Sequence, residues 1–174
     1  MDSIDRIANK ARKSISNFCI NECKSYCCRK GYLILTEKQK QKVVGSKEEQ
    51  YKDQIKQIDK NKFSLFMGKS DKSCPSLNKD FKCNIYNSKL RPKACHDFPL
   101  FINKRDKKAL FSPRCLAVHM GLLYKFSKQL QLKGYKITEI NSMVGMTGLE
   151  LPSNFVDEKI EKERSTQKIY KSQS

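Results

Sequence analysis

Eight cysteines in two groups constrain what this chain can fold into more than any other feature. The first group is compact, with the spacing C-x3-C-x3-CC, and the second is widely spaced. The compact group is Cys19, Cys23, Cys27 and Cys28, and the spaced group is Cys74, Cys83, Cys95 and Cys115. Thiolates are soft ligands, and four at tetrahedral spacing select zinc or an iron-sulfur cluster over magnesium or calcium. Eight thiolates are enough for two such shells, so the pattern predicts a metal or cluster protein.

Four disulfides are the main alternative use of the same cysteines, and they require an oxidising compartment. Residues 1–18 contain no apolar core of a secretory signal, and no later stretch reaches membrane-spanning length. We therefore expect a reduced, cytoplasmic chain that does not associate with a membrane. Cysteines can also serve as small buried hydrophobic side chains. The adjacent pair Cys27-Cys28 and the turn residues beside other cysteines limit that role to one or two of them.

The length of 174 residues suits one domain, and a hydrophobic content of 38% allows only a modest core. Metal sites offset such a shortage, because the binding free energy of a structural site, on the order of 10 kcal/mol, is largely folding free energy. The formal net charge of +18 predicts attraction to polyanions. Only seven of the 36 basic residues are arginine, the residue that base reading and bidentate phosphate clamps favour. We therefore expect non-specific polyanion binding by a diffuse lysine coat.

Hydrophobic spacing predicts a small, helix-rich α+β fold with short strands, in which both cysteine groups converge. We expect one cysteine-cluster domain over residues 1–156 and a polar helix or tail over 157–174. The expected helices begin at Ser3, after Thr36 as N-cap, at Leu116 and at Thr138, and Gly134 is expected to cap the third. The expected strands are 32–35 and 63–67, with a hairpin of 100–102 and 109–111. The polar stretch 46–62 is interpreted as an exposed helix or mobile insertion.

The segment from Arg91 to Pro99 has the features of a stiff platform for Cys95. Pro92 fixes its own backbone and favours extended conformations in the residues before it, and Pro99 closes the loop. Arg91 is interpreted either as an ordinary loop residue or as a donor of charge and hydrogen bonds to thiolates or cluster sulfurs. His96 has three alternatives: a ligand, a proton carrier or a surface ring. His119 falls on the apolar face of its expected helix, which favours a core role.

The ordered motifs resemble one known family. They are the compact cysteine group, Cys74-Pro-x-Leu, Cys83-Asn-Ile-Tyr, and Arg91-Pro-x-x-Cys95-x-x-Phe-Pro. Over roughly residues 18–118 this combination resembles the YkgJ-type cysteine-cluster family, described as zinc- or iron-chelating and related to the flagellin lysine N-methylases. The resemblance implies chelation by the seven matching cysteines, with Cys115 as a further member. The chain departs from the family in having His96 where the family often has arginine, and in a first spacing longer than C-x2-C-x2-CC.

Three functions compete on these observations. The first is a metal- or iron-sulfur-binding module with a structural or electron-transfer role and an unidentified protein or redox partner. The second is a cluster-dependent enzyme related to the lysine methylases. The absence of a glycine-rich nucleoside loop of G-x-G type from the sequence is evidence against it. The third is a metal-stabilised nucleic-acid-binding protein, motivated by charge alone. An iron-sulfur cluster, of the 4Fe-4S type, is favoured over zinc, because a cluster tolerates more widely spread ligands than one ion.

Overall fold

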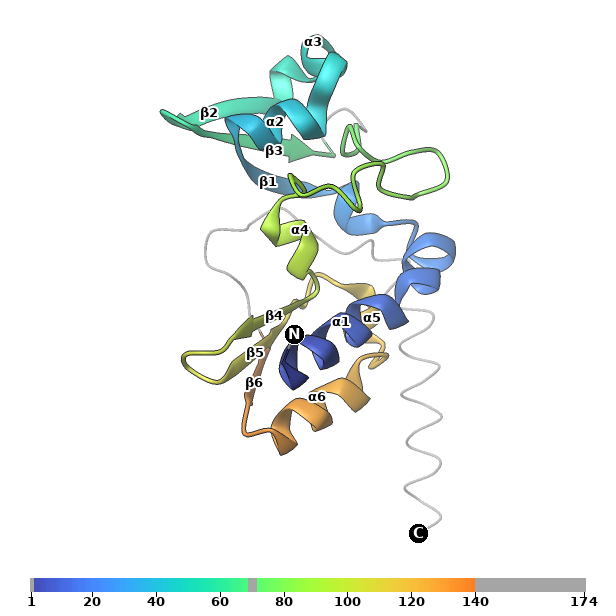
Figure 1. Cartoon of the computed structure of the whole chain (residues 1–174). Coiled ribbons are helices and arrows are strands. Elements are labelled where there is room, and N and C mark those ends of the chain that lie inside the picture. Colours follow the sequence, from blue (N-terminus) through green and yellow to red (C-terminus); the bar gives the residue numbers. More distant parts are fainter. Residues whose placement is uncertain (1, 69–71, 140–174) are drawn as a thin grey trace.

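The computed structural model describes residues 2–68 and 72–139. These residues form two small three-stranded sheets at opposite ends, each with its own helices and its own hydrophobic core. The segments that carry the cysteines lie mainly between the two ends (Figure 1). The mixture of helices and short strands confirms the predicted α+β class.

The first sheet has the order β1-β3-β2, and all its pairings are antiparallel. Its strands are β1 (Gly31–Thr36), β2 (Ile55–Asp59) and β3 (Lys62–Met67). Helix α2 (Glu37–Val44) begins directly after β1, because the Thr36 side chain accepts from the Gln39 amide in a capping box. One face of β1 packs with α2 and β3 into a core, which consists of Leu33, Leu35, Val43, Val44, Leu65 and Met67.

The second sheet has the order β4-β5-β6, with β4 antiparallel and β6 parallel to β5. Its strands are β4 (Leu100–Asn103), β5 (Lys108–Phe111) and β6 (Lys136–Glu139). Helices α1 (Ser3–Ser14) and α6 (Tyr124–Leu132) pack with it. The predicted apolar stripe of α1 is confirmed, and its buried members join a core with residues of the sheet and of α6. The main members are Ile4, Ala8, Ala11, Ile15, Leu100, Ala109, Phe111, Phe126 and Leu130.

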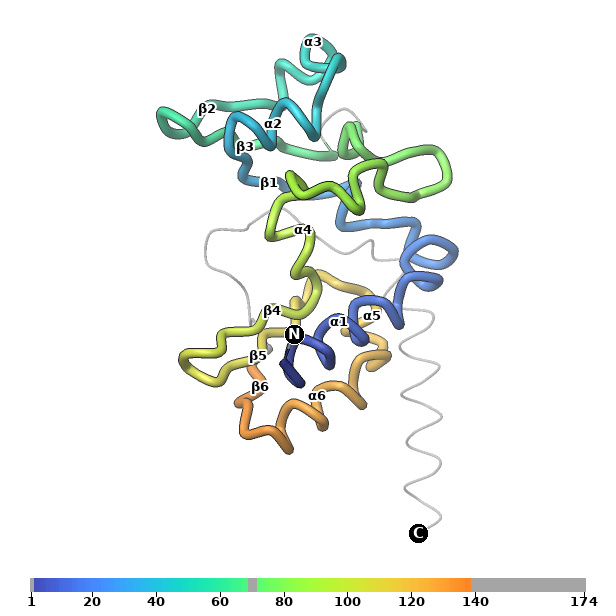
Figure 2. The backbone as a smooth tube through the Cα atoms, viewed as in Figure 1, coloured from blue at the N-terminus to red at the C-terminus, as the bar shows by residue number. Residues whose placement is uncertain are grey.

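Short helical turns connect these parts and position most of the cysteines. They are η1 (Phe18–Glu22), η2 (Tyr26–Cys28), η3 (Gly45–Lys47), α3 (Glu48–Tyr51), η4 (Lys52–Gln54), α4 (Lys93–Asp97) and α5 (Leu116–His119). Figure 2 shows the path of the chain: the N-terminal segment after α1 meets the segment before α4 between the two sheets. The backbone bond from Cys74 N to Cys28 O, at 2.7 Å, joins these segments.

Three expectations about elements were wrong. The stretch 46–62, expected as an exposed helix or mobile insertion, is helical only as far as Gln54, in η3, α3 and η4. It continues as β2, an edge strand that is mostly exposed and therefore lacks the alternation of a half-buried strand. The helix expected from Leu116 is broken into α5 and α6, and Gly121 between them has a φ of 71°, which ends a helix. Thr138 lies in β6 rather than opening a helix. The expected continuation of that helix and the polar segment 157–174 lie outside the described residues.

Candidate metal centre

The compact cysteine group begins on the π-helical turn η1. Cys23 N donates to Phe18 O at 3.0 Å, a bond that spans five residues instead of the usual four. A π turn accommodates one extra residue in a helical path. It thereby absorbs the longer C-x3-C spacing, and Cys19 and Cys23 stay on one turn, where the Cys23 thiol donates to Cys19 O at 3.5 Å.

Cys27 and Cys28 follow a backbone reversal. Lys24 and Ser25 both have positive φ angles, 52° and 50°, an uncommon conformation for residues with side chains. The Ser25 hydroxyl secures this reversal, because it donates to Phe81 O at 2.7 Å in the loop before Cys83. The compact group is therefore attached directly to the spaced group.

Cys74 and Cys83 lie on a loop that one of its own side chains anchors to helix α2. Ser76 donates to Val43 O at 2.7 Å in a buried bond, and Asn84 N donates back to Ser76 O at 2.8 Å. An isolated bridge pairs Leu77 with Cys83. These bonds fix the loop without a regular strand.

Cys95 is on α4, directly after the motif that begins with Arg91. Pro92 is the N-cap of α4, with φ −56° and ψ 137°. Leu90 before it lies in a turn rather than in an extended segment. The Arg91 guanidinium donates to Cys95 O at 2.8 Å and stacks on Tyr86, with 4.2 Å from its central carbon to the ring centroid. These contacts join Arg91 to α4 and to the loop that carries Tyr86, and the stiffness of the segment stays a prediction.

Asp97 at the end of α4 connects the platform to α1. Arg12 donates to Asp97 O at 3.1 Å and to Leu100 O at 2.6 Å, and pairs with the Asp97 carboxylate at 3.6 Å. His96 Nδ1 lies 3.0 Å from the same carboxylate, and Lys93 also binds it. Burial raises the pKa of Asp97, but the bonds from His96 and Lys93 and the charge of Arg12 outweigh it and lower the pKa.

All eight cysteines are free thiols, and the charges that they exert on one another group most of them into two neighbouring sets. Cys28 links the sets, because its charge raises the pKa of Cys19 and the charge of Cys23 raises the pKa of Cys28. The first set combines one cysteine of the compact group with three of the spaced group. Its members are Cys28, Cys74, Cys83 and Cys95. Burial raises the pKa of Cys74 and of Cys95 to about 12, and a negative charge on Cys28 adds to the shift of both. Burial followed by the Cys28 charge also raises the pKa of Cys83.

The second set is Cys19, Cys23 and Cys115. A side-chain hydrogen bond between Cys19 and Cys23 raises the pKa of Cys19 and lowers that of Cys23. Cys115 precedes α5 and belongs to the second core, where burial raises its pKa to about 11 and a charge on Cys23 adds to the shift. Cys27 shares a side-chain hydrogen bond with Cys28, and this bond, with burial, raises the pKa of Cys28.

No three His, Cys, Asp or Glu side chains within residues 2–68 and 72–139 stand close enough together to hold a metal ion as they are placed. The donor chemistry of the first set nevertheless fits a soft metal or a cluster. Four thiols from four loop or helix-end positions lie within electrostatic reach of one another, and Arg91 lies among them. A group that carries positive charge removes the repulsion that keeps such thiols protonated.

The site also contains features that the sequence did not predict. The Arg12–Asp97 connection joins residues far apart in the chain, and nothing in the local pattern indicates it. His119 is exposed rather than in the core, because the chain turns at Gly121 and the expected apolar face does not continue through it. His96 is also exposed, and its ring faces Asp97.

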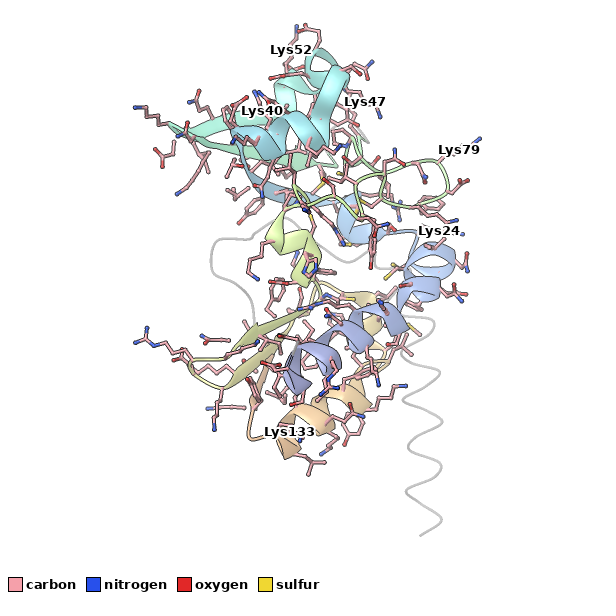
Figure 3. All side chains as sticks on the ribbon, in the orientation of Figure 1. Lys24, Lys40, Lys47, Lys52, Lys79 and Lys133 are labelled. Atoms are coloured by element: carbon pink, nitrogen blue, oxygen red, sulfur yellow. The ribbon has the colours of Figure 1, made fainter. Side chains whose placement is uncertain are left out.

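Lysine side chains are spread over both ends of the molecule and its middle, as the labelled examples in Figure 3 show. Several are engaged: Lys40 pairs with Glu48 at 2.7 Å, and Lys47 donates to Pro75 O at 2.9 Å. This distribution agrees with a diffuse coat. None of the helices within the described ranges is both long enough and apolar enough to cross a membrane.

Comparison with protein-family models matches residues 18–116 to CxxCxxCC, described as a putative zinc- or iron-chelating domain. Searches of curated proteins and of solved structures returned no match. The matched range covers more than half of the chain and includes all eight cysteines. It begins at η1 and ends at the start of α5, so it contains both thiol sets and the Arg91 platform. The chain belongs to the CxxCxxCC family.

Proposed function

We propose that the chain binds an iron-sulfur cluster or zinc through Cys28, Cys74, Cys83 and Cys95, in a structural or electron-transfer role. One observation carries the proposal: four free thiols lie on three segments of the chain, two of which are joined by a backbone bond, and they oppose one another's ionisation. The bond from Cys74 N to Cys28 O holds the two cysteine groups together at this place.

The physical reason to expect a cation at these thiols is the cost of their negative charge. Thiolates, not thiols, bind metals, and burial together with neighbouring negative charges makes ionisation unfavourable for Cys74 and Cys95. A bound cation supplies the missing compensation, and binding releases the thiol protons. The chain uses three separate segments for these ligands, the turn η2, the loop of Cys74 and Cys83, and α4, so ligation also fixes these segments to one another.

The spread of the thiols favours a cluster over a single ion. The sulfur atoms affect one another's ionisation, yet no three of the described donor side chains converge as one small ion requires. A four-iron cluster occupies a larger volume and binds through four cysteines. Bound there, it supplies one-electron redox chemistry, and a zinc ion in the same place supplies structure only.

The second set supports a further proposal, that Cys19, Cys23 and Cys115, with Cys27, hold a second metal. Cys27 is adjacent to Cys28 and so borders the first set. If only three thiolates bind, one coordination position stays open, an arrangement typical of catalytic rather than structural sites. The alternative of a cluster-dependent enzyme related to the lysine methylases would need such an open position.

Anaerobic purification followed by iron, zinc and sulfide analysis tests the proposal. We expect iron and acid-labile sulfide in similar amounts, with the visible absorption of an iron-sulfur cluster. A colourless protein that contains zinc supports the structural role and not the electron-transfer role. A folded chain that retains neither metal, and takes up neither when iron and sulfide or zinc are supplied under reducing conditions, contradicts the proposal.

A further inference from the structure

Arg91 has one buried donor that no other group satisfies in the described structure. Its Nε lies beyond the reach of solvent and has no hydrogen-bond partner, whereas its terminal nitrogens donate to Cys95 O at 2.8 Å and Tyr86 O at 3.5 Å. Burying an N–H without an acceptor costs about 1–3 kcal/mol, so such groups are rare and call for an explanation.

The guanidinium is also held in place, and its charge acts on thiols of the first set. Two backbone acceptors and the Tyr86 ring, 4.2 Å away, fix its plane. Its positive charge acts on three thiols from three segments, Cys28, Cys83 and Cys95, and in each it lowers the pKa against the effect of burial. Planar, delocalised arginine suits this role, because it stays charged and directs several donors in fixed directions.

We propose that Arg91 Nε donates a hydrogen bond to a sulfur of the metal or cluster held by the first thiol set, and that Arg91 thereby positions and stabilises that group. This inference rests on the proposed function and deepens it. A charge-assisted bond to a ligand sulfur both satisfies the buried donor and spreads the negative charge of the thiolate shell. Arg91 is a positioning residue and not itself a ligand, since guanidinium has no free lone pair to offer.

Arg29 provides a matched control within the same chain. It also donates to a cysteine carbonyl, Cys23 O at 3.4 Å, and its central carbon lies 5.8 Å from the Tyr26 ring centroid. Its charge lowers the pKa of Cys23 in the second set. Its Nε, however, is satisfied, because it donates to Lys24 O at 2.9 Å. The two arginines therefore differ in the one feature that the proposal uses.

The test compares Arg91→Lys with Arg29→Lys in the full chain, loaded with zinc alone and, separately, with iron and sulfide. Lysine keeps the charge but removes the Nε–H and its fixed direction. We measure the transfer of zinc to a chelator and the reduction potential and lifetime of the cluster. Loss of a partner of this kind typically weakens metal binding 10- to 100-fold. We expect at least a tenfold change in Arg91→Lys and less than a twofold change in Arg29→Lys.

Equal behaviour of the two variants overturns the role of Arg91 while leaving the proposed metal site intact. Failure of the unmutated chain to bind either metal overturns the proposed function itself, so the two failures are distinguishable. If Arg91→Lys does not fold, a measurement on the unmutated chain tests the role of Arg91 instead. In the ¹⁵N-arginine-labelled chain we expect hydrogen exchange of the assigned Arg91 Nε–H to slow at least tenfold on zinc loading. An unchanged rate contradicts the proposal.

Discussion

The two thiol sets differ in where their members come from, and the difference separates ligation from packing. The first set collects one residue from η2, two from an irregular loop and one from α4. In the second, Cys19 and Cys23 share a single helical turn, and Cys115 is 6% exposed within the core beneath the second sheet. Among the arginines of residues 2–68 and 72–139, Arg91 alone has an unsatisfied buried donor, and its charge acts on the first set. Packing in a core accounts for Cys115 without metal, whereas Cys28 and Cys83 are not among the residues that form or pack against either core.

The sets also abut different cores. Cys74 and Cys95 pack against the core of the first sheet, and Cys19 and Cys115 belong to or pack against that of the second. Under the proposed function, ligation by the first set would fix the middle of the molecule to the first core. The Arg12–Asp97 connection then transmits that anchoring to α1 and the second core.

The largest expected effect is loss of metal and fold together when a first-set ligand is replaced. In Cys83→Ser or Cys95→Ser, a hard oxygen replaces a soft thiolate, and metal binding is coupled to folding. We expect loss of the first centre's metal and a fall in stability of several kcal/mol, up to the order of 10 kcal/mol for a structural site. Metal analysis and urea unfolding measure both.

Cys115→Ser is the matched control from the second set. It places a hydroxyl in an apolar core and should cost about 1–3 kcal/mol, but the first centre should keep its metal. If Cys115→Ser loses as much metal as Cys83→Ser, the two sets form one centre and the distinction between them is wrong. Unchanged metal content in Cys83→Ser and Cys95→Ser shows instead that both are spectators.

The pH dependence of the chelator-treated chain tests the burial of the first set. The pKa of Cys74 and Cys95 is raised from 9.0 to about 12. The folded state therefore favours the protonated thiols. Their contribution is complete below about pH 9 and is lost as the pH rises from about 9 to about 12, at about 1.4 kcal/mol per pH unit for each thiol.

We expect the double variant Cys74→Ala and Cys95→Ala to lose less stability than the unmutated chain between pH 8 and pH 10.5, measured by urea unfolding. Taking the difference between the two chains cancels the titration of lysines. Parallel stability curves contradict burial of these thiols in the folded, metal-free chain. With metal bound the sign reverses, because acid protonates the ligands and weakens binding.

A smaller effect concerns the link between the two regions. Asp97→Asn removes the charge that pairs with Arg12, and both side chains are largely buried, at 15% and 14% exposure. We expect a loss of about 1–3 kcal/mol in the free energy of unfolding, because a buried hydrogen bond to a charged group is worth about this much. The metal content should stay the same.

Asp59→Asn is the control for that variant, since the Asp59–Lys62 pair at 3.7 Å is exposed on both sides. Exposed pairs contribute about 0–1 kcal/mol. An equal, small loss in Asp97→Asn and Asp59→Asn rules out a mechanical link through Arg12.

The smallest expected difference between the two ends of the molecule is in their contribution to polyanion binding. Lysines cover both ends of the molecule, so binding of unrelated DNA and RNA oligonucleotides should weaken steeply with salt and show no sequence preference. Titrations at two salt concentrations measure this. One oligonucleotide bound on the order of a thousandfold more tightly than the rest makes nucleic acid the partner and the metal centre its scaffold.

The sequence predicted what depends on local pattern. The stripe of α1, the Thr36 cap and the hairpin of β4 and β5 follow from spacing and turn residues, and the structure has all three. It did not predict β2, whose stability comes from pairing with β3 rather than from its own exposed side chains. The number and spacing of the cysteines also predicted that they bind metal and that their two groups converge. Their division into sets depends on the π turn at η1 and on contacts between distant segments, which no local pattern encodes.

Anomalous diffraction from crystals of the metal-loaded chain tests the central claim most directly, because it locates each metal and identifies its ligands. The account predicts a metal or cluster bound by Cys28 of the compact group together with Cys74, Cys83 and Cys95 of the spaced group. A metal held by Cys19, Cys23, Cys27 and Cys28 alone, remote from Cys74, Cys83 and Cys95, contradicts it.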